Sequence, residues 1–234
     1  CAVAYASESP FREAKLTAMF LTPALDLALP KISISPYMSF ERFITNRTTQ
    51  FLGGKAQLTS STITLPSIPD FLVIYCKKQS YTNKEAEWYM PVTKISLQFD
   101  NYSGICSTLS KEELYQISYE NGLKMDYNVY SGGANTPNGV VSTIGCFLLL
   151  KMGKDIPLQT SQASGVSGNY SLQFNCEVEL PKNIGEVPTE VSLTVMTPNS
   201  GYFMTKSGSS MIFKNLLSES DVMSARQVNT DEDG

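Results

Sequence analysis

The amino-acid sequence predicts an all-β protein: an eight-stranded antiparallel jelly-roll sandwich with one short helix in a connection. The first observation is a series of short segments rich in Val, Ile, Thr, Tyr and Phe, bounded by Gly, Pro, Asn and Ser. The second is that no segment repeats at a fixed period, which argues against propellers and solenoids. The third is a charged fraction of only 17%, against roughly 25% in typical soluble domains, which is typical of stacked strands with a polar, neutral surface. Eight strands suit a jelly roll, whose two four-stranded sheets protect their edges by wrapping.

Eight segments carry the strand pattern. In residues 123–130, LKMDYNVY, apolar and polar residues alternate, so one face points to the core. Residues 144–151, IGCFLLLK, lack this alternation, which predicts a central strand covered on both faces. A ninth strand is expected between residues 202 and 213. The eight predicted strands are residues 14–21, 58–65, 71–77, 93–99, 123–130, 144–151, 169–180 and 189–196.

One helix is predicted, over residues 111–121. Ser110 and Glu113 have the spacing of a capping box, in which each side chain accepts a hydrogen bond from the other residue's backbone N–H. Gly122 can end the helix in a left-handed conformation.

Four long connections are expected between the strands: residues 22–57, 78–92, 131–143 and 152–168. Long connections in compact domains are usually functional or mobile.

The 234 residues are expected to divide into a jelly-roll domain, residues 1–217, and an acidic C-terminal tail, residues 218–234. The tail holds five carboxylates and one arginine, which accounts for the whole formal charge of −4. A neutral body does not concentrate nucleic acid, so direct sequence-specific nucleic-acid binding is not expected. The tail has few large apolar residues and is expected to lack fixed structure on its own.

The chemistry of the sequence argues against an enzyme. Histidine is absent, which removes the commonest general base and metal ligand. No phosphate-binding glycine motif, C-x-x-C pair or serine-lysine arrangement is present, so no catalytic, cofactor or metal residue is predicted. Glu177 and Glu179 lie on one strand face, where a pair of carboxylates could in principle cleave glycosides. Alternating acids on a strand are more often a solvated outer face.

The cysteines indicate the compartment of folding. Cys76, Cys146 and Cys176 lie in apolar runs and are expected to be buried free thiols, which indicates folding in the host cytoplasm or nucleus. No apolar run approaches the roughly 18 residues of a membrane span. The chain has no initiator Met, so we expect a processed product or a piece of a larger polypeptide.

Three residues are candidates for contacts with partners, and three others are candidate anchors of the tail. Tyr81, Trp88 and Tyr89 lie on the polar connection 78–92 and are expected to be exposed outer-loop or assembly contacts, because aromatic residues bury much area at low entropic cost. The alternative is that they pack back on their own sheet. Phe213, Leu216 and Leu217 precede the acidic tail and are expected to anchor it to the body.

Four blocks carry a resemblance to a known family. They are ITLPSIPDFLVIY at residues 63–75, PVTKISLQFDNYSGICSTLSKEELYQISYENGLKMDY at 91–127, GCFLLLKMGKDIPL at 145–158 and GVSGNYSLQF at 165–174. Together they resemble the C-terminal jelly roll of double jelly-roll major capsid proteins of virophages, Polinton or Maverick elements and polinton-like viruses. The chain is about half the size of a whole family member or less.

The resemblance implies a structural protein without catalysis or cofactor. Three copies of the complete two-roll protein would form a pseudo-hexagonal capsomer, and capsomers would tile an icosahedral virion shell around DNA. Implied partners are the rest of the same capsid protein, neighbouring capsomers, and minor capsid or penton proteins. Two other functions stay open: a carbohydrate-binding jelly-roll module, in which Trp88 and the nearby tyrosines stack on sugars, and a glycosidase that uses two carboxylates.

Overall fold

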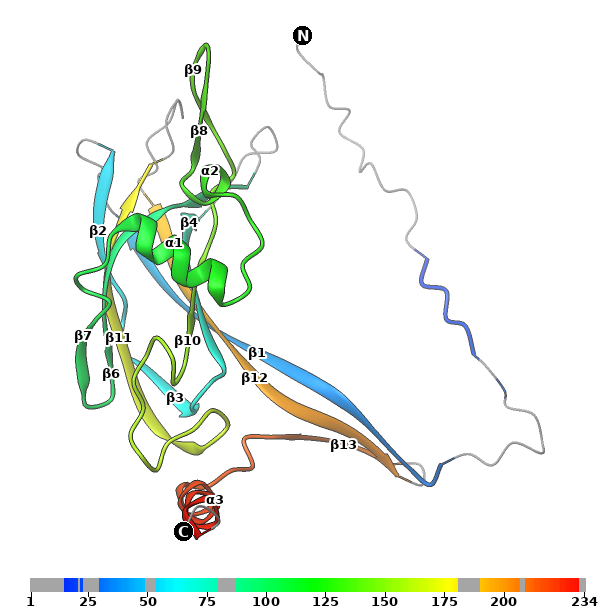
Figure 1. Ribbon diagram of the computed structural model, residues 1–234. Coiled ribbons are helices and arrows are strands. Elements are labelled where there is room, and N and C mark those ends of the chain that lie inside the picture. The colour runs from blue at the N-terminus through cyan, green and yellow to red at the C-terminus, as the bar shows by residue number, and fades with distance from the viewer. Residues whose placement is uncertain are drawn as a thin grey trace.

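In the computed structural model, two antiparallel sheets pack face to face, with a helix along one side and a long β arm that leaves the body (Figure 1). The structure describes residues 15–20, 22, 30–48, 54–79, 87–180, 190–206 and 209–231, with side chains up to residue 225.

The first sheet has the strand order β1-β12-β4-β10, with β13 paired to β12 and β5 paired to β4. Its strands are β1 (Ile32–Thr48), β4 (Phe71–Lys78), β5 (Tyr89–Met90), β10 (Leu148–Lys151), β12 (Glu190–Lys206) and β13 (Ser209–Lys214).

The second sheet has the order β2-β11-β6-β7, with β3 paired to β11, and a separate hairpin joins β8 and β9. Three helices, α1 to α3, complete the described elements. The remaining elements are β2 (Lys55–Thr59), β3 (Ile63–Ser67), β6 (Val92–Phe99), β7 (Tyr102–Ile105), α1 (Lys111–Glu120), α2 (Tyr127–Tyr130), β8 (Gly133–Thr136), β9 (Gly139–Ser142), β11 (Ser167–Glu179) and α3 (Glu219–Asp231).

The pairing order is that of a jelly roll. Strand β1 pairs with β12, β2 and β3 pair with β11, β4 pairs with β10, and β6 pairs with β7. The chain therefore runs as one long hairpin whose successive strand pairs alternate between the two sheets, which is how a jelly roll wraps. The predicted sandwich is confirmed. The predicted count of eight strands differs, since the described residues form thirteen.

The space between the sheets holds one continuous core. Along β11, Leu172, Phe174, Cys176 and Val178 are buried, while the residues between them are exposed or half-buried. This alternation follows from the pleat, which points successive side chains to opposite faces. Buried side chains of the first sheet, such as Ile74, belong to the same cluster.

The strand predictions for 71–77, 93–99 and 169–180 are confirmed by β4, β6 and β11. The prediction for 58–65 corresponds to two strands, β2 and β3, separated by three residues. The predicted strand at 144–151 is shorter, because β10 begins at Leu148.

One strand prediction, 14–21, and one predicted connection, 22–57, fail in the N-terminal part of the chain. The described residues 15–20 form no strand and lie exposed, although their alternation favours one. The predicted connection 22–57 instead contains β1, a strand of 17 residues. Residues 22–57 contain three prolines, which favour a loop, but an edge strand tolerates a proline such as Pro36, because its outer side needs no N–H donor.

The predicted strand at 123–130 is wrong. Its last four residues form the short helix α2, and the preceding residues are irregular. Aromatic packing explains the difference, because the Tyr115 ring of α1 lies 5.2 Å from that of Tyr127 and 5.3 Å from that of Tyr130. Leu123, Tyr130 and Cys146 form a second small core beside these rings. Tertiary contacts thus override the local alternation.

The helix prediction is confirmed in detail. The Ser110 Oγ accepts a hydrogen bond from the Glu113 N–H at 3.3 Å, and Glu113 Oε2 accepts one from the Ser110 N–H at 2.7 Å. Gly122 follows the helix with a φ of +108°, a conformation that favours glycine.

Strand β10 lies at an edge of the first sheet, not in its centre as predicted. Helix α1 covers that edge and satisfies its backbone. The Ser118 Oγ accepts a hydrogen bond from the Leu149 N–H at 3.1 Å, and the Asn121 Nδ2 donates to the Leu149 carbonyl at 3.0 Å. A covered edge cannot recruit a further strand.

We expect Ser118→Ala to lower the free energy of unfolding by about 1–3 kcal/mol, because it leaves the Leu149 N–H without its acceptor. Ser118 is fully buried, so water cannot replace the hydroxyl. Urea unfolding measures the change. Gln116→Ala on the exposed side of the same helix is the control, and an equal loss in both variants would contradict the role of the hydroxyl.

The prediction of buried free thiols is confirmed for Cys76, Cys146 and Cys176, which are buried and outside any disulfide. Burial raises the pKa of the Cys176 thiol to about 12 and that of Cys76 further still. These thiols are therefore protonated at neutral pH and behave as small apolar side chains.

Candidate assembly surface

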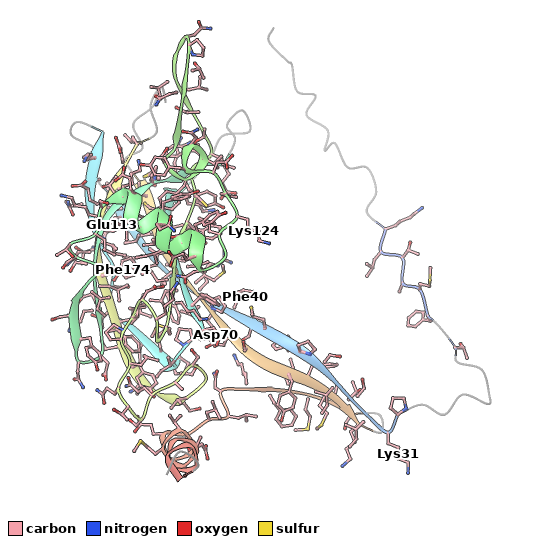
Figure 2. All side chains as sticks on the ribbon, viewed as in Figure 1. Lys31, Phe40, Asp70, Glu113, Lys124 and Phe174 are labelled. Atoms are coloured by element: carbon pink, nitrogen blue, oxygen red, sulfur yellow. The ribbon has the colours of Figure 1, made fainter. Side chains whose placement is uncertain are left out.

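Strands β1 and β12 continue beyond the sandwich and form a long arm, to which β13 adds a third strand (Figure 1). We define the arm as residues 32–40, 198–206 and 209–214. Figure 2 shows its side chains standing on both sides of the ribbon, away from the body, with Phe40 near its base and Lys31 at its tip.

Register divides the side chains of the arm between two faces. In the body, Phe43 of β1 packs on the core, so the odd-numbered residues of β1 face the interior of the sandwich and the even-numbered ones face outward. Cross-strand partners share a face, which places Ile34, Met204 and Met211 in one row of the outer face. The next row contains Pro36, Tyr202 and Phe213.

The outer face of the arm is apolar and exposed. The exposed fraction is 62% for Ile34, 59% for Phe40 and 53% for Met211. The rings of Tyr202 and Phe213 stack across β12 and β13, at 4.8 Å between their centroids. Contiguous apolar surface of this kind marks interaction sites in soluble proteins. The other exposed large apolar residues of this face are Ile32, Met38 and, at the base of the arm, Ile44.

The opposite face is more polar. Ser33 and Ser35 lie on it, and Lys214 forms an ion pair with Glu41 at 3.0 Å. Tyr37 and Ile212 are its exposed apolar residues. The arm therefore has one continuous apolar face and one mixed face.

The structure places the predicted aromatic contacts differently from expectation. Tyr81 lies outside the described residues. Trp88 is half-buried and packs against the main core. Tyr89 is half-buried in β5, where its ring meets that of Tyr75 edge-on at 5.5 Å. For Trp88 and Tyr89 the alternative of packing on their own sheet holds, and their role in assembly stays a prediction.

Of the three predicted anchors of the tail, Phe213 lies in β13, and Leu216 and Leu217 follow that strand. Phe213 belongs to the arm and stacks on Tyr202. The Leu217 carbonyl accepts a hydrogen bond from the Ser167 N–H at 2.9 Å, which ties the chain to the sandwich. Leu216 is exposed. The anchoring role itself remains a prediction.

Helix α3 follows these residues, within the segment expected to lack structure. The Ser218 N–H donates to Asp221 Oδ2 at 2.8 Å, and the Asp221 N–H donates to the Ser218 Oγ at 3.3 Å. The Ser218 hydroxyl, which donates to Asp221 Oδ2 at 2.6 Å, and then the Ser218 N–H lower the pKa of the Asp221 carboxyl. The signal was present in the sequence as Ser-x-x-Asp, a capping-box spacing. Only Val222 of α3 packs against the main core among its described side chains.

The carboxylate pair on β11 does not resemble a glycosidase site. Glu177 accepts hydrogen bonds from Thr93 at 2.7 Å, Lys55 at 3.0 Å and Gln57 at 3.1 Å. The hydrogen bonds from Thr93 and then Lys55 lower the pKa of Glu177, whereas a general acid requires a raised pKa. Glu179 is engaged separately by Lys111 at 3.5 Å.

The lowered pKa of Glu177 predicts a pH dependence. A depressed carboxyl pKa stabilises the fold above the unfolded value near 4.3, and this stabilisation is lost as pH falls through the folded pKa. We expect Glu177→Gln to be less stable than the parent at neutral pH by about 1 kcal/mol. The difference should shrink in acid. Melting temperatures between pH 3 and 7 measure this, and a constant difference would contradict the assignment.

Two further findings concern the described part of the chain. No group of three or more Asp, Glu and Cys side chains there could hold a metal ion. None of the helices in these residues is long and apolar enough to cross a membrane.

Comparisons with known proteins place the fold in a family. Residues 40–201 match the family model of the major capsid protein V20 C-terminal domain. The chain is 26% identical over 236 residues to the putative capsid protein V20 of Sputnik virophage, covering 92% of this chain and 39% of that protein.

Two solved structures have the same fold. A chain of the Sputnik virophage structure determined by cryo-electron microscopy superposes with a TM-score of 0.76 at 24% identity, over 86% of this chain and 42% of that one. The crystal structure of the mavirus major capsid protein gives 0.70 at 17% identity, over 87% and 46%. This chain thus spans less than half the length of these relatives. With more than half of its residues matched by the family model, the chain belongs to the major capsid protein V20 C-terminal domain family.

Proposed function

We propose that this chain is the C-terminal jelly roll of a major capsid protein and that it builds a virion shell by packing side by side with other rolls. The observation that carries the proposal is the jelly-roll pairing order, in a region that matches the capsid family over residues 40–201. A shell protein needs a rigid sandwich and contact surfaces, and no reaction. The continuous core supports a rigid sandwich, and the apolar face of the arm offers a contact surface.

The complete protein is the functional unit in this proposal. The relatives are more than twice as long as this chain, so the rest of the same polypeptide is its first partner. Three copies of the complete protein then form a pseudo-hexagonal capsomer, and neighbouring capsomers, with minor capsid or penton proteins, close an icosahedral shell. The neutral body agrees with side-by-side packing, because it has no net charge to repel its neighbours.

Folding takes place in the cytoplasm or nucleus of the host, and the folded protein then enters the capsid. The buried free thiols support a reducing compartment. The carbohydrate-binding alternative has less support, because Trp88 packs against the core and is only half-exposed.

The mass of the complete protein in solution tests the proposal. We expect trimers or larger particles by light scattering, with the β-rich spectrum of a sandwich. A folded complete protein that remains monomeric at all concentrations would contradict a capsomer-forming role. Binding to immobilised glycans by that monomer would favour the carbohydrate-binding alternative.

Deletion of residues 218–234 is expected to leave the sandwich folded and to reduce particle yield. Helix α3 contributes only Val222 to the core among its described side chains, so its removal costs little stability. The acidic tail is proposed to reach a basic groove of a neighbouring subunit or minor capsid protein, and its loss should matter most at low salt. Melting temperature and particle yield are compared with the full chain. A large drop in melting temperature would show that the tail belongs to the fold, and an unchanged yield would remove its assembly role.

A further inference from the structure

We propose that the outer face of the arm packs against the same face of a second copy of this chain. The inference rests on the proposed function, because a shell brings many copies of the chain together. The proposed contact surface lies outside the sandwich. The contact is isologous: the same residues of both copies become buried around a two-fold axis.

The size of the apolar face suits such a contact. Six large apolar side chains, each about half exposed, line β1 and β13 on this side. At roughly 200 Å² for a large side chain, they leave on the order of 600 Å² of apolar surface on one copy. A standard protein interface buries about 800 Å² per partner. The arm therefore offers most of a stable interface before any polar rim is counted.

The arm favours packing on its face over strand addition at its edge. Among the strands that the structure describes, none pairs with the outer edge of β1. Pro36 lies in the middle of the arm portion of β1, residues 32–40, and has no backbone N–H. Proline on an edge disfavours the pairing of further strands. No comparable feature prevents another surface from packing on the exposed side chains of the outer face.

The charges of the outer face distinguish a second copy from an acidic partner. Arg42 lies at the base of the face and Lys206 at its tip. On the described strands, no carboxylate shares this face with the apolar residues between them. The Asp70 carboxylate borders the face at its base, where it accepts a hydrogen bond from the Ser200 N–H at 2.9 Å. A second copy brings the same cations, so added salt should strengthen the contact by screening their repulsion. An acidic partner, such as the C-terminal segment of a neighbour, would show the opposite salt dependence.

Sedimentation equilibrium of the 234-residue chain tests the inference with two matched double variants. Ile34→Thr with Met211→Thr changes the outer face, and Tyr37→Thr with Ile212→Thr changes the opposite face of the same strands. Threonine keeps strand propensity, and all four sites are exposed, so both variants should melt like the parent. We expect about tenfold or greater weakening of self-association for the outer-face variant and little change for the control.

Oxidative cross-linking gives a second readout. We expect Met38→Cys, on the outer face, to form disulfide-linked dimers, and Ser35→Cys, on the opposite face, to form few. The inference is overturned if the parent stays monomeric, if both double variants weaken association equally, or if salt weakens it. If the complete protein still forms capsomers in any of these cases, the proposed function stands and only the arm contact fails.

Discussion

Replacing Phe174 with alanine is expected to lower the free energy of unfolding by about 3–5 kcal/mol. Phe174 lies in the middle of β11 and is 2% exposed in the core between the two sheets. Its removal loses apolar burial and leaves a cavity that a rigid sandwich cannot fill. Since domains are stable by roughly 5–15 kcal/mol, the loss should also reduce the yield of folded protein.

Urea unfolding at neutral pH measures the effect of Phe174→Ala. Gln173→Ala is the matched control, because Gln173 is the preceding residue of the same strand and points to the other face. We expect the control to change stability by less than about 0.5 kcal/mol. A Phe174→Ala variant as stable as the control would show that the two sheets do not pack as described.

The second large effect is expected at Gly145. Its φ is +72°, and an added Cβ would lie 2.1 Å from the Tyr89 carbonyl oxygen, which is backbone and cannot move aside alone. The neighbouring Ile144 carbonyl accepts a hydrogen bond from the Tyr89 N–H at 2.7 Å, so the two segments are held together. We expect Gly145→Ala to cost about 3 kcal/mol or more, from the left-handed backbone and the clash together.

Gly153→Ala separates these two causes. Gly153 has a similar φ of +78°, but its nearest contact would be the Leu158 Cδ1 at 3.6 Å, an ordinary distance. Gly153→Ala should therefore lower the free energy of unfolding by only about 1–2 kcal/mol, the cost of the left-handed backbone alone. Thermal unfolding of both variants measures the difference. Equal losses would contradict the close approach of residues 89 and 145.

Local signals in the sequence predicted the elements that local interactions determine. The capping box of Ser110 and Glu113 fixed the start of α1, and the alternation along 169–180 identified β11 and its buried face. Both patterns depend on neighbours within a few residues. The number of strands then favoured a jelly roll, which no single segment specifies, and the family resemblance agreed with it.

The end of β12 shows where local signals fail. The sequence TPNSG after Met196 resembles a turn, yet β12 continues to Lys206 through Pro198 and Gly201. Gly201 is required there because an added Cβ would lie 2.3 Å from the Phe213 carbonyl oxygen of β13. A glycine at a close approach between strands resembles a turn glycine when only the sequence is known.

The arm was missed for the same reason. Its strands were divided between a predicted loop, 22–57, and a single ninth strand expected between residues 202 and 213, where the structure has the end of β12 and then β13. Their shared apolar face could therefore not be recognised. The alternation of Ile32, Ile34, Met38 and Phe40 was the available signal. These side chains form a continuous surface only because β1 pairs in register with β12, and β12 with β13. That register depends on residues far apart in the sequence.

The central claim is that this jelly roll is a building unit of a capsid shell. Cryo-electron microscopy of particles assembled from the complete protein tests it most directly. The account predicts closed icosahedral particles whose capsomers contain three copies of this sandwich, fitted by residues 54–79, 87–180 and 190–206 without rearrangement. Particles whose capsomers have no density for this sandwich, or a folded complete protein that never assembles, would contradict it.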